Sequence, residues 1–436
     1  MSDIRVRFAP SPTGKVHIGN IRAAIYNWLY ARHTGGKFLL RIEDTDLERS
    51  TPEAIKALFE CMEWLKLDWD EEVFYQTKNV KRHIEVVDRL LSSGHAYKVE
   101  KTSRDGKTGV VTMFRMPKEG VIEFDDIVKG RMSKKAEDVQ DFAIVRSDGS
   151  PIFHIANVVD DIDQRVTHII RGDDHVENTF KHICIFKALG APVPKYGHLS
   201  MIVNQQGKPY SKRDGAAFVG EFREQGYLPE ALFNYLLLLG WNPGDDREVL
   251  SRDEMVKLFE LEKVHVTAAM FDLKKLQWMN GEYVKRLPRD VFEAELRKRV
   301  EAADLSVPEG FDMPALIDQM QVRTKFLSDM PANVAYFFTD DYPYDEKSVE
   351  KRLKKDGVKD TLLDLVQRFS AVSEWKAPVL EAVIKELSQG NGMGPWVHPI
   401  RVAVSGRMDG PGLFEMLEIL GRDKTLARLK KTADML

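Results

Sequence analysis

The chain has 436 residues, a formal net charge of −4 and 43% hydrophobic residues. This length exceeds what one hydrophobic core fills, so we expect two to four domains. The sequence contains no apolar run long enough to span a bilayer and no leader segment, which predicts a cytoplasmic protein with no membrane partner. Its small negative charge does not indicate nucleic-acid binding by the whole molecule, so any such binding depends on local basic patches.

The two cysteines, Cys61 and Cys184, lie far apart in the sequence, inside segments with helical periodicity. Neither belongs to a CxxC pair, so the sequence predicts no disulfide framework and no zinc cage. A reducing compartment fits this cysteine usage.

The first distinctive stretch, residues 4–20, reads IRVRFAPSPTGKVHIGN. Residues 4–8 have the apolar alternation of a strand, residues 10–14 are loop formers, and apolar residues recur at helical spacing from His17 onward. A strand, a proline- and glycine-rich loop and a helix are the layout of a nucleotide site in an open parallel sheet. There, loop N–H groups and the helix N-terminus face phosphates.

Acidic residues directly follow two predicted strands. Residues 37–42 run into Glu43 and Asp44, and the strand at 166–170 ends in RGDDH at 171–175. Side chains at the carboxyl ends of strands contact the ligand in open α/β sheets. A solvated acidic loop is the alternative interpretation of the first cluster.

Helix boundaries are marked clearly in the first half of the chain. Thr51 and Pro52 predict a helix start, as an N-cap followed by a proline in the first turn. Residues 79–93 form an amphipathic helix that ends at Gly94, and residues 178–189 form another.

Residues 97–141 differ in sequence pattern from the segments before them. Short β-like pieces at 109–113 and 121–124 alternate there with turns and basic residues. This predicts an insertion between two halves of an α/β domain, whose pattern resumes at 142–146 and continues through the apolar segment 152–161. The basic residues are as compatible with a solvated surface as with a phosphate backbone.

The second half of the chain is helical in pattern. Residues 229–239 predict a nearly all-apolar helix, and Ser251 with Glu254 predicts a capping box. Residues 273–280 predict a helix closed by Gly281, and the sequence after it has the charge and periodicity of amphipathic helices.

Five motifs follow one another in a fixed order: FAPSPTGKVHIGN from Phe8, LLRIEDTD from Leu39, VVDD from Val158, HIIRGDDH from His168 and YSKR from Tyr210. Together they resemble the class I aminoacyl-tRNA synthetases, and the glutamyl-tRNA synthetases most closely. WMNGEY at 278–283 and GPGLFE at 410–415 resemble the helical half of that family, so the resemblance runs along the whole chain.

This resemblance implies an α/β Rossmann-like parallel-sheet catalytic domain with a short inserted α+β subdomain, followed by all-α stem-contact and anticodon-binding domains. The implied boundaries are 1–96 and 142–215 for the catalytic halves, 97–141 for the inserted acceptor-end-binding subdomain, 216–288 for the stem-contact domain, and 289–366 and 367–436 for the two anticodon-binding subdomains.

The activity implied is ATP-dependent ligation of L-glutamate to tRNA(Glu) through glutamyl-adenylate, by a monomer, with Mg²⁺ accompanying ATP. The implied catalytic residues are His17 and Lys212. The ATP-binding residues implied are Pro10, Thr13, Gly14, His17, Gly19, Asn20, Asp174, His175, Ser211, Lys212 and Arg213. Those for glutamate are Arg7, Ala9, Ser11, Glu43, Phe153, Asn157 and Arg171, and those for tRNA are Asp44, Arg115 and Arg323.

The chemistry of these residue types fits their implied roles. A histidine at a helix start donates to phosphate oxygens, and Lys212 closes over the β- and γ-phosphates as charge develops. Arginine forks bind carboxylates bidentately, so Arg7 and Arg171 suit glutamate and disfavour glutamine, while Glu43 holds the ammonium group. A salt bridge from Arg171 to Asp173 or Asp174 is the structural alternative.

Three departures from the family pattern stand out. The family usually has tyrosine where this chain has Phe153, and the first lysine of the KMSKS motif is replaced by Pro209. The insertion also lacks the cysteines that bind zinc in some members, so we expect no structural zinc.

A second stretch, RMSKK at 131–135, is more similar to KMSKS than residues 209–213 are. The second motif must follow the last strand of the nucleotide fold, and 131–135 precedes two of those strands. We therefore interpret 131–135 as a basic surface turn of the insertion.

Four alternatives stay open at this point. One is glutaminyl-tRNA synthetase, disfavoured by the helical C-terminal half, and another is a non-discriminating enzyme that also charges tRNA(Gln), for which Arg323 is a candidate determinant. A truncated paralogue that glutamylates a modified tRNA base lacks the C-terminal half present here. A non-catalytic tRNA-binding paralogue is disfavoured by intact His17 and Lys212.

Overall fold

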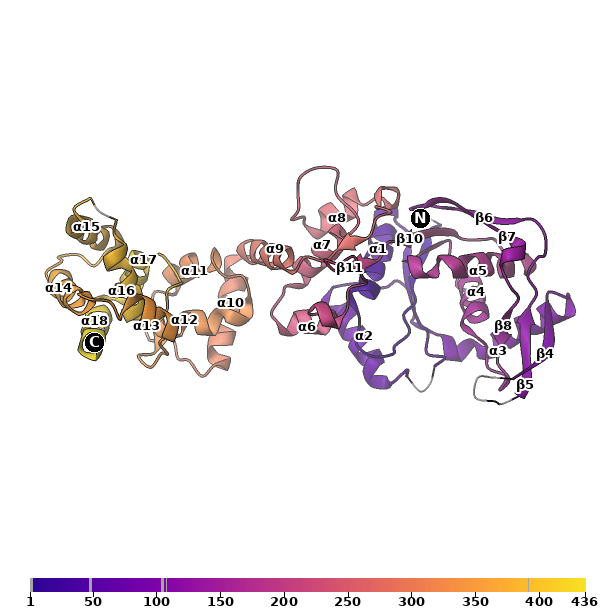
Figure 1. The fold of residues 1–436 in the computed structure, drawn as a ribbon, viewed down its shortest axis with the longest axis horizontal. Coiled ribbons are helices and arrows are strands. Elements are labelled where there is room, and N and C mark those ends of the chain that lie inside the picture. Colours follow the sequence, from indigo (N-terminus) through magenta and orange to yellow (C-terminus); the bar gives the residue numbers. More distant parts are fainter. Residues whose placement is uncertain (1–2, 47–48, 103–105, 107, 391) are drawn as a thin grey trace. The chain divides into compact units, whose positions relative to one another are not determined.

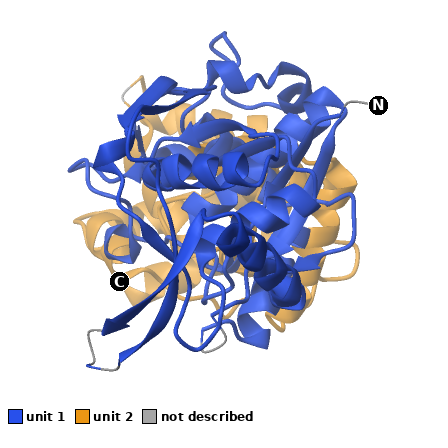
Figure 2. Cartoon of the chain, turned by 90° about the vertical axis from the view of Figure 1, so that its right-hand side faces the viewer, with its two compact units in different colours: residues 1–224, 229–276 blue, residues 225–228, 277–436 orange. Residues whose placement is uncertain are grey.

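The computed structural model describes residues 3–46, 49–102, 106, 108–390 and 392–436. It divides into two compact units, residues 1–224 with 229–276, and residues 225–228 with 277–436 (Figure 1). Figure 2 colours them separately. The first unit is α/β and the described part of the second is helical, which confirms the predicted fold class.

A parallel sheet forms the core of the first unit. Its parallel pairs are β1 (Arg5–Phe8) with β2 (Lys37–Ile42), β2 with β3 (Phe74–Tyr75), and β9 (His168–Gly172) with β10 (Lys195–Leu199). The two sets are joined because the Thr167 amide donates to the Arg5 carbonyl at 2.9 Å. The strands predicted at 4–8 and 37–42 are therefore confirmed, and the one predicted at 166–170 begins two residues later.

Helices cover both sides of this sheet. Helix α1 (Ile18–Thr34) lies on one side, and α4 (Phe153–Asp163) with α5 (Val176–Ala188) lies on the other (Figure 1). The apolar segment at 152–161 is thus a helix. This doubly wound arrangement brings the carboxyl ends of β1, β9 and β10 to one edge, where a ligand site is expected.

The inserted residues form more strand than the sequence predicts. β4 (Ala96–Thr102), β5 (Thr108–Phe114) and β8 (Phe142–Val145) make an antiparallel sheet, and β6 (Val121–Asp126) pairs antiparallel with β7 (Gly130–Lys135). The interpretation of 131–135 as a turn is wrong, because these residues lie in β7 and complete a hairpin. β6 in turn pairs in parallel with β10, which joins the insertion to the parallel sheet.

The remaining helices and strands of the first unit are α2 (Pro52–Trp64), α3 (Val80–Ser92), β11 (Ile202–Val203), α6 (Val219–Glu224), α7 (Pro229–Leu238), α8 (Arg252–Leu258) and β12 (Ala269–Met270). Two predicted helix starts are confirmed by their caps. The Thr51 side chain accepts from the Ala54 amide at 3.2 Å, and Ser251 forms the capping box with Glu254.

Helix α9 (Leu273–Lys285) does not end where the sequence predicts. Gly281 lies inside it, and a Cβ there would come within 3.5 Å of the Lys325 side chain. The neighbouring Asn280 accepts from the Leu228 amide at 2.7 Å and donates to the Lys325 carbonyl at 2.6 Å. Gly281 is therefore an interior residue of the helix that faces the Lys325 segment, rather than a helix end.

The second unit has one apolar core that runs through all of its major helices. These are α10 (Arg289–Ala302), α11 (Met313–Gln321), α12 (Met330–Phe338), α13 (Glu346–Arg352), α14 (Val358–Ser370), α15 (Ala377–Ser388), α16 (Gly394–Ser405), α17 (Leu413–Leu420) and α18 (Arg422–Met435). Across the part of the chain that the structure describes, no helix combines the length and apolarity needed to cross a bilayer.

A glycine between α1 and β2 is predicted to be essential for stability. A Cβ on Gly36 would lie 2.5 Å from the Ile4 carbonyl oxygen, and that carbonyl already accepts from the Lys37 amide at 2.8 Å. We expect Gly36→Ala to destabilise the first unit by about 1–3 kcal/mol, because backbone must shift to relieve the overlap. The shift in thermal unfolding midpoint, followed by circular dichroism, measures this effect.

The matched control is Gly220→Ala in α6, where a Cβ meets open space. Alanine is a better helix former than glycine, so this variant should be as stable as the wild type or more so. Equal midpoints for the two variants would contradict the packing argument.

Candidate active site

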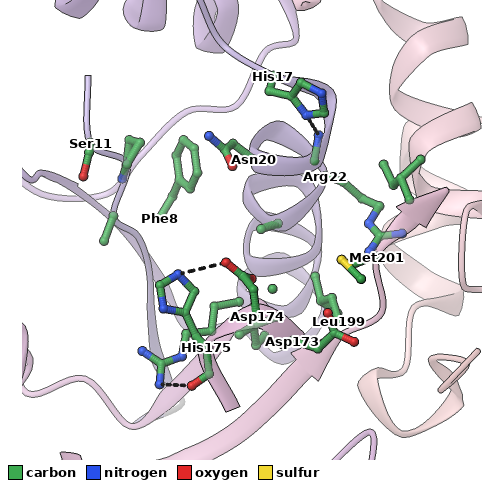
Figure 3. Close-up of a pocket in the computed structure, with 18 of the residues that line it drawn as sticks. Phe8, Ser11, His17, Asn20, Arg22, Asp173, Asp174, His175, Leu199 and Met201 are labelled. Atoms are coloured by element: carbon green, nitrogen blue, oxygen red, sulfur yellow. Dashed lines mark hydrogen bonds and ion pairs between the residues drawn. The ribbon is translucent and has the colours of Figure 1, made fainter. Parts of the chain in front are cut away.

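A cavity of about 440 Å³ opens at the carboxyl ends of β1, β9 and β10 (Figure 3). The predicted site residues that line it are Arg7, Ala9, Pro10, Ser11, Thr13, His17, Gly19, Asn20, Glu43, Phe153, Asn157, Arg171, Asp174 and His175. Arg7 and His175, 168 positions apart in sequence, thus meet around one space. Four predicted ATP residues lie outside its lining: Gly14, Ser211, Lys212 and Arg213.

His17 caps the N-terminus of α1. Its Nδ1 accepts a hydrogen bond from the Gly19 amide at 3.1 Å, which leaves Nε2 to carry the proton of a neutral ring (Figure 3). Burial lowers the pKa of His17, and a hydrogen bond with the Tyr210 backbone opposes this shift. The imidazole is therefore a neutral Nε2–H donor at the wall of the cavity.

A buried ionic cluster forms the floor beside Arg7. The Asp161 carboxylate accepts from Arg41 at 2.6 Å and from the Arg7 Nε at 3.1 Å. Arg41 also donates to Asn157 at 2.9 Å and pairs with Glu43 at 3.3 Å. Burial alone would raise the pKa of Asp161, but the two guanidinium groups outweigh it and lower that pKa.

Glu43 is almost fully buried in the same cluster. Burial raises its pKa, while the Arg41 and Arg7 charges act in the opposite direction. A carboxyl group in this position has a strong preference for a further cation. An ammonium group in the cavity would supply one.

Arg171 projects from β9 and is 8% exposed. Its Nη2 donates to Thr179 Oγ1 at 2.7 Å, and none of the ion pairs among the described residues includes it. Asp173 instead pairs with Lys129 at 3.2 Å, and Asp174 lies 3.6 Å from His175 (Figure 3). The alternative of a salt bridge from Arg171 to either aspartate is therefore wrong.

The histidines around the cavity are not a source of positive charge. Burial, with Arg171 nearby, lowers the pKa of His175 to about 4. Its ring stacks on Phe153 with centroids 5.6 Å apart. Near neutral pH, the cations that remain in the lining are arginines.

Two buried polar atoms of the lining, Asn157 Nδ2 and Arg22 Nε, have no hydrogen-bond partner among the described residues. Asn157 is 2% exposed, and its Nδ2 makes no hydrogen bond to any described residue. Burying an amide donor without an acceptor is costly. An oxygen of a bound molecule would satisfy it.

Lys212 lies on a short ordered loop. Ser211 caps the 3₁₀ turn Lys212–Asp214 and exchanges hydrogen bonds with Asp214, while the Lys212 side chain is exposed. Just beyond the loop, the Ile18 amide donates to the Ala217 carbonyl at 3.0 Å, and the Val219 amide donates to the Val16 carbonyl at 3.0 Å.

The residues predicted to contact tRNA lie outside the cavity. Asp44 accepts from the Thr77 amide at 2.9 Å and from its hydroxyl at 2.6 Å. Arg115 is exposed and lies 4.8 Å from the centre of the Tyr97 ring. Arg323 belongs to the second unit and is exposed on its surface.

The lining also includes residues that the sequence argument missed: Phe8, Arg22, Ala23, Ile170, Gly172, Asp173, Leu199, Ser200, Met201, Ile202, Pro209 and Tyr210. Arg22 is the most informative of these. It is 4% exposed and donates to the backbone carbonyls of Leu239, at 2.8 Å, and Ser200. The sequence feature that could have identified Arg22 is an arginine on the apolar face of a predicted helix.

Among the described residues, no group of three or more histidine, cysteine, aspartate or glutamate side chains is arranged to hold a metal ion. Cys61 and Cys184 are both free thiols.

The comparisons with known proteins agree with this geometry. Residues 3–107 and 98–278 match the family described as tRNA synthetases class I (E and Q), catalytic domain, and residues 264–433 match an anticodon binding domain. The chain is 40% identical to a glutamate–tRNA ligase of Francisella tularensis subsp. novicida, over 99% of both chains.

Two solved structures are also similar. A glutamate tRNA ligase from Elizabethkingia meningosepticum, in complex with its amino acid, is 29% identical with a TM-score of 0.88 over 100% of both chains. A glutamate–tRNA synthetase from Elizabethkingia anophelis is 29% identical with a TM-score of 0.86, over 99% of this chain and 100% of that one. With these matches along its whole length, the chain belongs to the glutamate–tRNA ligase family of class I aminoacyl-tRNA synthetases.

Proposed function

We propose that the chain attaches L-glutamate to tRNA(Glu) in two steps. The α-carboxylate of glutamate first attacks the α-phosphorus of ATP, which forms glutamyl-adenylate and releases pyrophosphate. A hydroxyl of the terminal adenosine of the tRNA then takes the acyl group, and AMP leaves. The observation that carries this proposal is one cavity whose wall includes the buried arginines Arg7 and Arg171, a buried carboxylate and the N-terminus of a helix.

The amino-acid end of the cavity is proposed to lie between Arg7 and Arg171. Two guanidinium groups match the two carboxylates of glutamate, and Glu43 matches its ammonium group. The unpaired Asn157 Nδ2 is proposed as a donor to the substrate. Ala9, Ser11 and Phe153 complete the proposed pocket. The Phe153 ring carries no hydroxyl.

The ATP end is proposed to lie along the start of α1. A neutral His17 with Nε2–H donates to phosphate oxygens, and the helix N-terminus attracts the same negative charge. We propose that Pro10, Thr13, Gly14, Gly19, Asn20, Asp174, His175, Ser211 and Arg213 line the rest of the nucleotide path, with Mg²⁺ bound to the ATP itself. Lys212 is proposed to reach the β- and γ-phosphates as the transition state forms.

For tRNA we propose contacts through Asp44, Arg115 and the exposed Arg323. The high identity to glutamate–tRNA ligases favours tRNA(Glu) over the non-discriminating alternative. We further propose a monomer in the cytoplasm. Free thiols suit a reducing compartment.

Substrate choice is tested by ATP–pyrophosphate exchange with glutamate and with glutamine, each with and without tRNA(Glu) and tRNA(Gln). A neutral side-chain amide presents N–H donors to the guanidinium groups and has no charge to pair with them, so we expect glutamate to exceed glutamine by at least about 100-fold. We also expect exchange to require tRNA. Exchange with glutamine alone would contradict the proposed activity, and strong exchange without tRNA would contradict only the second expectation.

The role of Lys212 is tested by Lys212→Ala. Loss of one cation that stabilises developing phosphate charge is expected to lower adenylate formation by about 100- to 1,000-fold. Lys134→Ala is a matched control, because Lys134 also follows a serine, in the similar sequence RMSKK. Lys134 lies on β7 and pairs with Glu177 of α5 at 2.6 Å. If both variants kept wild-type rates, the catalytic lysine would have to lie on another loop.

A further inference from the structure

Behind Arg171, a chain of buried hydrogen bonds runs from the inserted residues into the active-site wall. Asp126, the last residue of β6, accepts from the His198 Nδ1 at 2.6 Å and from the His198 amide at 3.2 Å. The Asp126 and His198 side chains are both fully buried. Neither residue lines the cavity, so neither belongs to the proposed substrate contacts.

The state of His198 follows from its partners. With Nδ1 donating to Asp126, the Nε2 of a neutral ring is an acceptor, and it lies 3.0 Å from Thr179 Oγ1 and 3.4 Å from the Arg171 Nε. Burial lowers the pKa of His198, against the opposing bond to Asp126, which agrees with a neutral ring. The imidazole Nε2 is therefore placed to accept from the side chains of Thr179 and Arg171.

This chain engages one edge of the Arg171 guanidinium. Nε faces His198, and Nη2 donates to Thr179 at 2.7 Å and to the His175 carbonyl at 3.3 Å. The described residues provide no hydrogen-bond partner for Nη1, while Arg171 lines the cavity. Rotation of the guanidinium would break the hydrogen bonds of Nε and Nη2, so Nη1 is held in one direction.

Packing from the insertion supports the same arrangement. Phe124, two residues before Asp126 in β6, packs on Tyr196 and on His198 with centroids 5.5 and 6.2 Å apart. The Tyr196 ring in turn lies 5.7 Å from the Arg171 guanidinium carbon. The support for Arg171 is thus shared between β6 and β10.

We propose that Asp126, His198 and Thr179 are positioning residues that set amino-acid specificity by orienting Arg171 toward a substrate carboxylate. The proposal rests on the proposed binding of glutamate. It assigns to the insertion, through Asp126, a role in amino-acid selection in addition to any contact with tRNA.

The first test is steady-state exchange with Thr179→Val, which keeps the shape of the side chain and removes the hydroxyl. We expect the KM for glutamate to rise at least about tenfold, with the KM for ATP and kcat within about twofold of wild type, because a misoriented Arg171 weakens only amino-acid binding. We expect Thr179→Ser, which restores the hydroxyl, to return the KM for glutamate to near the wild-type value.

A matched control is Thr112→Val, the same change at another buried threonine, in β5 and away from the cavity. His198→Asn is an independent variant: its amide can still donate to Asp126, but it has no acceptor at the position of Nε2. It should raise the KM for glutamate by a similar factor. It also tests the proposal if the Thr179→Val variant fails to fold.

The outcomes separate the two proposals. An active wild type in which neither Thr179→Val nor His198→Asn changes the KM for glutamate would overturn the positioning role alone. Equal losses with glutamate and ATP in these variants would also overturn it, since they indicate a merely structural role. A wild type without glutamate-dependent exchange would overturn the proposed function, and with it this inference.

Discussion

The active site depends on one buried carboxylate that two guanidinium groups share. Asp161 in α4 binds Arg7 from β1 and Arg41 from β2, all with less than one-twentieth of their side chains exposed. Desolvating each of these charges costs several kcal/mol, which their pairing offsets, so removing one partner would leave an uncompensated buried charge where the strand ends meet the helix. Because Glu43 follows Arg41 by two residues, the same pairing fixes where it faces the cavity.

Positive charge in the cavity lies on arginines, and the histidines of the lining do not add to it. Burial lowers the pKa of Arg171 only to about 10, so it stays protonated, whereas burial lowers the pKa values of His17 and His175 and favours their neutral forms. In the proposed binding mode, anionic reactants meet positive charge at the amino-acid end and neutral donors at the start of α1. This division suits a reaction that needs little proton transfer and much orientation of anions.

The sequence predicted the features that depend on residues close together in the chain. Thr51 and Pro52 predict a helix start, and Glu43 lies at the cavity because parallel strands end at a common edge. The resemblance to a family supplied most of the lining. What could not be predicted depends on contacts distant in sequence, such as the bond from His198 to Asp126 across 72 residues. Gly281 was wrongly predicted to end a helix, because α9 continues past it to Lys285.

The loop that carries Lys212 is anchored at both ends. A backbone bridge joins Val203 to Pro209, and the bonds of Val16 and Ile18 hold Val219 and Ala217. Only a few residues between these anchors are free to change their dihedral angles. The conformational entropy lost when such a segment closes over a nucleotide is small, because most of it is already lost on folding. The proposed closure over ATP would therefore be a local adjustment that spends little of the binding free energy of ATP on ordering the chain.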